Sequence, residues 1–78
     1  MSLIAKETQL KMIVPRLIRY KDAPRYCGMD KSFFDSRIRP NLPVELRDGS
    51  KFVAFDRIDL DFAIEGYKDR VGQIWGRN

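Results

Sequence analysis

The 78-residue sequence contains no histidine and a single cysteine, Cys27. Without an imidazole, neither a Ser-His-Asp nor a Cys-His catalytic arrangement can be assembled. One cysteine cannot form an intramolecular disulfide, and a zinc site without histidine would need unusual ligands. A chain of this length also has little room for a deep catalytic pocket with its supporting residues. The composition therefore predicts a protein that is not an enzyme and that holds no cofactor and no metal.

Long apolar runs are missing as well. No stretch approaches the length of a membrane-spanning helix, and the N-terminus lacks the basic and apolar pattern of a signal peptide. We therefore expect a cytoplasmic protein with no membrane partner and no small-molecule substrate. Apolar residues make up 44% of the chain and charged residues 33%, a balance typical of one small globular domain.

The charge is distributed unevenly along the chain. The net charge is +4, from 15 basic and 11 acidic residues. Residues 1–39 hold nine of the basic and four of the acidic side chains, whereas residues 40–78 carry a slight acidic excess. A surface that faces phosphates requires such an asymmetry, although ordinary domains show it too.

The first third of the chain predicts a helix followed by a tight turn. A short apolar segment, Leu17-Ile18, precedes a helix expected over roughly Tyr20–Cys27. Gly28 can take the positive φ that ends a helix, and Asp30 is a good N-cap for the next one. These residues indicate a helix end, a turn and a helix start in close succession.

A second helix is predicted over Lys31–Arg39, ending before Pro40. Phe34 and Ile38 lie four residues apart and form its buried stripe. The opposite side carries short polar and cationic side chains. Such a helix can lie in the major groove of DNA while it packs on its neighbour.

A β-hairpin and a third helix complete the pattern. Alternating apolar residues over 44–46 and 51–55 flank Asp48-Gly49, which is typical of a hairpin. Asp56 starts a helix whose apolar stripe continues to Tyr67. The predicted core consists of Tyr26, Cys27, Phe34, Ile38, Phe52, Phe55, Leu60 and Ile64. Cys27 is expected to act as a small apolar side chain, and the acids Asp56, Asp59 and Asp61 to cap and solvate a helix rather than bind a metal.

This succession predicts a mainly α fold with a small β-hairpin, a winged helix-turn-helix. We expect a flexible arm over residues 1–16, the winged helix-turn-helix domain over residues 17–70 and a disordered tail over residues 71–78.

Residues 17–64 resemble the AlpA/excisionase-like family, small winged helix-turn-helix proteins of phages and integrated elements that are similar to a trimmed MerR-type DNA-binding domain. The resemblance is carried by Ala23-Pro24-Arg25-Tyr26-Cys27-Gly28, by Leu42-Pro43 before the hairpin and by Asp59-Leu60-Asp61. It implies sequence-specific binding of double-stranded DNA in the role of an excisionase-type recombination directionality factor. The alternative role is that of an AlpA-like transcription regulator. Further copies of the chain and an integrase are the protein partners that the resemblance implies.

Some positions depart from the family pattern. Arg37 stands where an aromatic residue is common, and Ala63 where tryptophan is usual. We expect Phe33 and Phe62 to supply that aromatic volume from the adjacent positions. A function of another class, a protein-interaction module on a helix-turn-helix scaffold, also fits the nearly neutral second half of the chain.

The candidate DNA-contacting residues are cationic or short and polar. They are Lys31, Ser32, Ser36, Arg37 and Arg39 on the second helix, Arg19 and Arg25 beside the first helix, and Arg47 and Lys51 at the hairpin tip. Arg37 could contact a phosphate or stack on Phe33. Asp35 could accept a hydrogen bond from a cytosine amino group, but pairing with Arg39 one turn further on is favoured.

Overall fold

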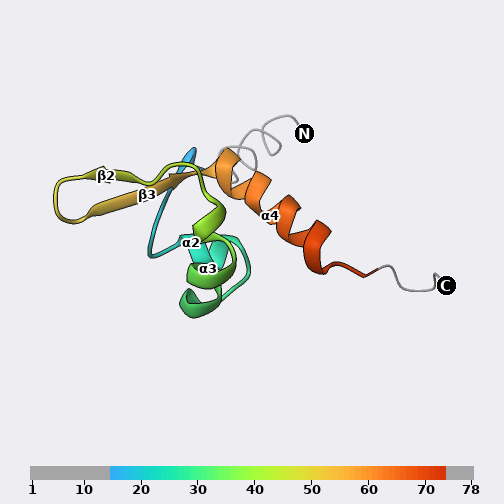
Figure 1. Ribbon diagram of the computed structural model, residues 1–78. Coiled ribbons are helices and arrows are strands. Elements are labelled where there is room, and N and C mark those ends of the chain that lie inside the picture. Colours follow the sequence, from blue (N-terminus) through green and yellow to red (C-terminus); the bar gives the residue numbers. More distant parts are fainter. Residues whose placement is uncertain (1–14, 74–78) are drawn as a thin grey trace, which may run out of the picture.

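Residues 15–73 are the part of the chain that the computed structural model describes, and they form three helices and one three-stranded antiparallel sheet (Figure 1). In chain order the elements are β1 (Leu17–Arg19), α2 (Ala23–Tyr26), α3 (Lys31–Arg37), a 3-10 turn η1 (Arg39–Asn41), β2 (Leu46–Asp48), β3 (Phe52–Asp56) and α4 (Arg57–Val71). Residues 1–14 of the predicted arm and 74–78 of the predicted tail lie outside the described residues. None of the described helices is long and apolar enough to cross a membrane.

The sheet has one strand more than the sequence predicts. β3 lies in the centre and pairs antiparallel with β1 on one side and β2 on the other. Ile18 of β1 lies opposite Phe55, and Arg47 of β2 lies opposite Val53. The segment Leu17-Ile18 is therefore part of a strand. A strand of three residues is too short to show the alternating pattern of a strand. Its pairing partner also lies far along the chain, so local sequence does not reveal the pairing.

The turn between α2 and α3 has the predicted chemistry. Gly28 has a φ of 73°, the left-handed conformation that glycine adopts at little cost. The Asp30 side chain accepts a hydrogen bond of 2.8 Å from the backbone N–H of Phe33 and so caps α3. Both helices are shorter than predicted. Pro24 lies at the very start of α2, and Pro40, which cannot donate a backbone hydrogen bond, belongs to η1 rather than to α3.

The core lies between α3, β3 and α4. Its largest fully buried side chains are Phe34, Ile38, Phe55 and Leu60. The rings of Phe34 and Phe55 meet edge to face with their centroids 5.6 Å apart, a favoured aromatic geometry. These four residues confirm half of the predicted core. The other four, Tyr26, Cys27, Phe52 and Ile64, are only half-buried.

Phe33 and Phe62 do not replace missing core aromatics, and this expectation is wrong. Phe33 is 42% exposed and Phe62 is 73% exposed. One residue along a helix turns a side chain by about 100°, so each lies well away from the buried stripe. Phe34 and Leu60 fill the core positions of their helices.

The start of α4 is fixed by its acids. Asp56 accepts a hydrogen bond of 2.9 Å from the backbone N–H of Ile58 and also binds the Arg16 guanidinium through two hydrogen bonds of 2.8 and 2.9 Å. Asp61 accepts from the Tyr26 hydroxyl. Helix capping by Asp56 is thereby confirmed, and the described residues hold no cluster of three metal-binding side chains.

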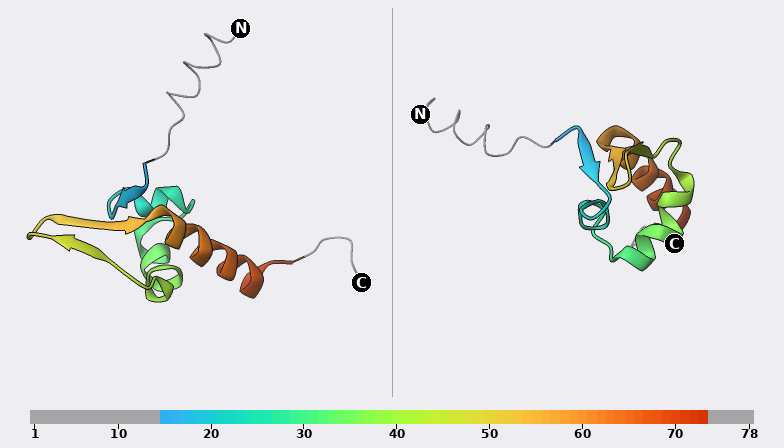
Figure 2. Two further views of the ribbon diagram at one scale, coloured as in Figure 1. Left: turned by 90° about the horizontal axis from the view of Figure 1, so that it is seen from above. Right: turned by 90° about the vertical axis from the view of Figure 1, so that its left-hand side faces the viewer.

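Beyond the core, the hairpin and the last helix leave the pair α2–α3 in opposite directions (Figures 1 and 2). The hairpin turns at Gly49, whose φ is 74°. Its strands project past the helices (Figure 2).

Candidate nucleic-acid interface

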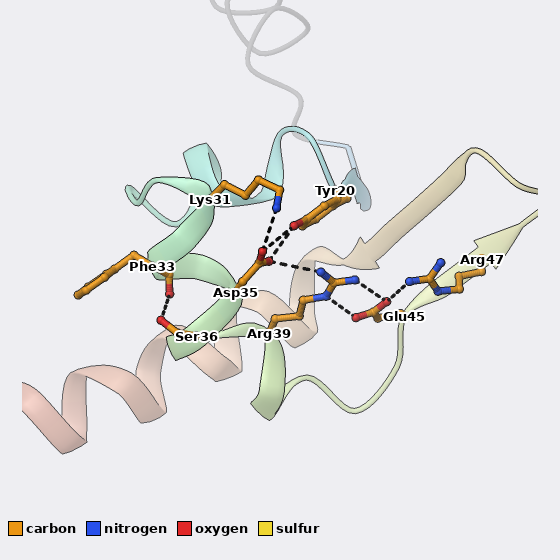
Figure 3. A network of polar contacts seen from close by, with 8 residues as sticks. All are labelled: Tyr20, Lys31, Phe33, Asp35, Ser36, Arg39, Glu45 and Arg47. Atoms are coloured by element: carbon orange, nitrogen blue, oxygen red, sulfur yellow. Dashed lines mark hydrogen bonds and ion pairs between the residues drawn. The ribbon is translucent and has the colours of Figure 1, made fainter.

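The outward side of α3 follows from its buried stripe. Phe34 and Ile38 point into the core, which directs Ser32 and Ser36 to the opposite side of the helix, where both are exposed. This is the surface on which the sequence places Ser32 and Ser36 as DNA-contacting residues. Phe33 is exposed as well, and its side chain points away from Tyr20 and Asp35 (Figure 3).

Tyr20 connects α3 to the rest of the surface (Figure 3). Its hydroxyl donates to the Asp35 carboxylate, whose two oxygens both lie at 2.8 Å. Lys31 lies 3.2 Å from the same carboxylate, and its ammonium nitrogen is 5.5 Å from the centre of the Tyr20 ring. The Arg39 guanidinium lies 4.6 Å from that ring centre. One tyrosine thus contacts an acid and two cations where the turn before α2, helix α3 and the turn η1 meet.

The network continues from Arg39 to the hairpin. Arg39 donates to Asp35 at 3.3 Å and to the two oxygens of Glu45 at 2.6 and 3.2 Å. Glu45 also accepts from Arg47 of β2 at 3.1 Å. The favoured pairing of Asp35 with Arg39 is confirmed. Because the Arg39 side chain is only 26% exposed and binds two carboxylates, the structure places it between α3 and the hairpin.

The carboxylates of this network are held in their charged form. The hydrogen bond from Tyr20, followed by that from Lys31, lowers the pKa of Asp35. The hydrogen bond from Arg39 lowers the pKa of Glu45, and that of Arg47 adds to the effect. Both acids therefore stay ionised and paired near neutral pH, and the adjacent cations compensate their charge.

Further cations surround Tyr20 on the side of the sheet. Arg19, Lys21 and Lys51 line a shallow hollow together with Tyr20 and Val53. The Arg19 guanidinium lies 4.7 Å from the centre of the Phe52 ring, which holds it against β3. We call Arg19, Lys21, Lys31 and Lys51 the Tyr20 cation cluster. Arg19, Lys31 and Lys51 are predicted site residues that the fold brings together.

Sequence reasoning missed Tyr20, Lys21 and Glu45 as members of this surface. Lys21 and Lys51 meet because β1 pairs with β3, and the strand β1 was not predicted. The spacing of charges around Asp35 predicted one contact of the network, the pair Asp35–Arg39. Lys31 and Arg39 lie four residues on either side of Asp35, which is one helical turn.

The remaining predicted residues lie around this surface. The Arg37 guanidinium lies 4.9 Å from the centre of the Phe33 ring. Of the two alternatives for Arg37, a phosphate contact or stacking on Phe33, the structure shows the stacking. The Ser36 hydroxyl donates to the backbone carbonyl of Phe33 at 3.2 Å. Arg25 lies outside the Tyr20 cation cluster and lines another hollow, which Arg19 shares.

Cys27 lies away from the cations. Burial, with the nearby charge of Asp61 as a second cause, raises the pKa of its thiol to about 11. The thiol is therefore protonated near neutral pH and is a poor nucleophile, which agrees with the expectation that it acts as a small apolar side chain.

Fold and surface together define the class of the molecule: a small mixed α/β domain that presents a helix, a hairpin and a cation cluster side by side. Comparison with protein-family models, curated proteins and solved structures found no match to the chain. The resemblance to the AlpA/excisionase-like family therefore stays a prediction from the residues quoted for it.

Proposed function

We propose that residues 17–70 form a winged helix-turn-helix domain that binds double-stranded DNA, with α3 in the major groove and the β2–β3 hairpin as the wing beside it. The observation that carries this proposal is the Tyr20 cation cluster. Its four cations come from β1, the turn before α2, α3 and the hairpin, and they gather around the Tyr20 side chain.

Cations from separate segments suit a phosphate backbone. Contacts to phosphates fix the position of a protein on a duplex, whereas side chains that reach base edges provide specificity. In this arrangement the cluster contacts phosphates and the side of α3 bearing Ser32 and Ser36 faces the bases. The tie from Arg39 to Glu45 sets the angle between helix and wing, so that both can contact one duplex.

The proposed biological role is that of an excisionase-type recombination directionality factor, and the alternative is an AlpA-like transcription regulator. Both need DNA binding, but only the first changes the outcome of an integrase reaction. A purified integrase with its attachment sites would separate them: a directionality factor increases excision over integration, whereas a regulator leaves that ratio unchanged.

The DNA-binding proposal is tested by measuring the affinity of the full chain for labelled duplex DNA over a range of salt concentrations. We expect affinity to fall steeply between about 50 and about 200 mM salt, with a logarithmic slope of about 0.9 for each phosphate neutralised. If no duplex binds even at the lowest salt, the proposal is wrong and a protein-interaction module becomes the better hypothesis.

A further inference from the structure

β1 forms one edge of the sheet. The strand order is β1-β3-β2, so β1 pairs with β3 on one side only. Just after β1, the backbone N–H of Tyr20 donates to the carbonyl of Val53 in β3 at 2.8 Å. Residues that bond the partner strand alternate in an antiparallel pair. The backbone of Ile18 therefore also faces β3, whereas the backbone groups of Leu17 and the N–H of Arg19 face outward.

The outward backbone groups open onto a hollow between β1 and α2, which lie side by side (Figure 2). We call this the β1 hollow; its lining includes Leu17, Arg19, Asp22, Arg25 and Tyr26. The Leu17 side chain is 43% exposed. The Arg19 carbonyl accepts from the backbone N–H of Asp22 at 2.9 Å. Within residues 15–73 this leaves both backbone groups of Leu17 and the N–H of Arg19 for a further strand, the kind of edge to which another chain can pair.

Cations predominate around the β1 hollow, since Arg19 and Arg25 face a single acid, Asp22. Within residues 15–73 Arg25 forms neither an ion pair nor a stack on an aromatic ring. A phosphate of DNA could accept from Arg25 and from the outward N–H groups, but it has no donor for the Leu17 carbonyl. A peptide backbone offers both a donor and an acceptor. The combination favours a peptide with carboxylate side chains.

We propose that the β1 hollow binds an extended acidic segment of a partner protein, which pairs with β1 as a fourth strand of the sheet. The backbone of the segment bonds Leu17 and Arg19, and one of its carboxylates binds Arg25. In this mode of recognition the main-chain hydrogen bonds provide affinity and the side chains provide specificity. None of the residues that line the hollow belongs to α3 or to the hairpin. The inference is therefore independent of the proposed DNA binding.

The probe is a phage-displayed library of random peptides of about nine residues, long enough for one strand, selected against the full chain. We expect the enriched peptides to combine aspartate or glutamate with β-branched residues and to lack a central proline. A synthetic copy of an enriched peptide should bind the Arg25→Gln variant about fivefold more weakly than the wild type, as for the loss of one exposed ion pair. The matched control is Arg70→Gln, the same change in the last turn of α4 outside the hollow, and should leave the affinity unchanged.

Amide hydrogen exchange of the wild-type chain tests the added strand itself. Bound peptide should slow exchange at the amides of Leu17 and Arg19, whereas the amides of β2, the other edge of the sheet, should exchange as before. The inference is overturned if no peptide is enriched, if the enriched peptides lack acids or if Arg25→Gln binds as tightly as the wild type. Unchanged exchange at Leu17 and Arg19 would overturn it too. The exchange measurement needs no variant, and none of these results bears on duplex binding.

Discussion

On its inner side α3 is held by aromatic and aliphatic packing, whereas on the side of the hairpin it is held by charges around one tyrosine ring. The inner contact joins Phe34 to Phe55 and Leu60, all completely buried. The outer contact joins Asp35 through Arg39 to Glu45, side chains that are between a quarter and a third exposed. Burial of apolar surface dominates stability, whereas partly exposed ion pairs add little of it and fix geometry through their directions. The apolar core therefore provides most of the stability of α3, and the ionic network fixes the position of the hairpin relative to α3.

The largest effect is expected from the core. Replacing Phe34 with alanine should lower the free energy of unfolding by about 3–5 kcal/mol, because a completely buried ring is lost and a cavity remains. Urea unfolding followed by circular dichroism measures this loss. Phe33→Ala, the same change one residue earlier at an exposed position, is the control and should cost less than about 1 kcal/mol. Equal losses in the two variants would contradict the division between inner and outer sides.

The tie to the hairpin should give an intermediate effect. Arg39→Met keeps most of the aliphatic stem but removes the guanidinium, which stacks on Tyr20 and is the shared partner of Glu45 and Asp35. We expect a loss of about 1–3 kcal/mol in the free energy of unfolding. The control is Arg47→Met, which removes a partner of Glu45 whose side chain is 60% exposed and should cost less than about 1 kcal/mol.

Arg39→Met also separates a positioning role from a direct contact with DNA. If Arg39 positions the hairpin, the variant should bind DNA more weakly. The slope of log affinity against log salt should still contain the contribution of every phosphate contact of α3. A slope lowered by about 1, as for the loss of one phosphate contact, with unchanged folding stability would show instead that Arg39 contacts DNA directly.

A smaller effect is expected at Tyr20. Tyr20→Phe keeps the ring but removes the hydroxyl that donates to Asp35, and should cost about 1 kcal/mol at neutral pH. The pKa of Asp35 is lowered in the folded protein, mainly by this hydroxyl. Its contribution to stability is therefore present above the unfolded pKa of about 4 and is lost as the pH falls through the folded pKa. Acid should thus destabilise the variant less than the wild type.

Unfolding free energies at several pH values between about 7 and 3 test this difference. Tyr67→Phe is the control, since the Tyr67 ring packs against the core and the hydrogen bonds to Asp35 come from other side chains. Identical acid dependence in wild type and Tyr20→Phe would contradict the role given to the hydroxyl.

Local patterns predicted the parts of the fold that depend on neighbours in sequence. The turn at Gly28, the cap at Asp30 and the stripe of Phe34 with Ile38 each need only a few adjacent residues, and the structure confirms them. The same holds for the pair Asp35–Arg39, whose members are one helical turn apart.

Contacts between distant segments could not be predicted in the same way. β1 is a strand because β3 offers it a partner, and three residues carry too little periodicity to show that. Lys21 and Lys51 meet for the same reason. Glu45 binds Arg39 across the connection from η1 to the hairpin, a distance in sequence at which no helical or strand spacing applies.

Contact between the Tyr20 cation cluster and DNA phosphates is central to the proposed function. The most direct measurement compares the salt dependence of duplex binding in two double variants that remove the same charge. Lys21→Gln with Lys51→Gln changes the cluster, and Lys68→Gln with Arg70→Gln changes the last turn of α4. We predict that the first pair lowers the slope of log affinity against log salt by about 1 for each lysine, whereas the second leaves it unchanged. Equal slopes in the two variants would contradict the claim.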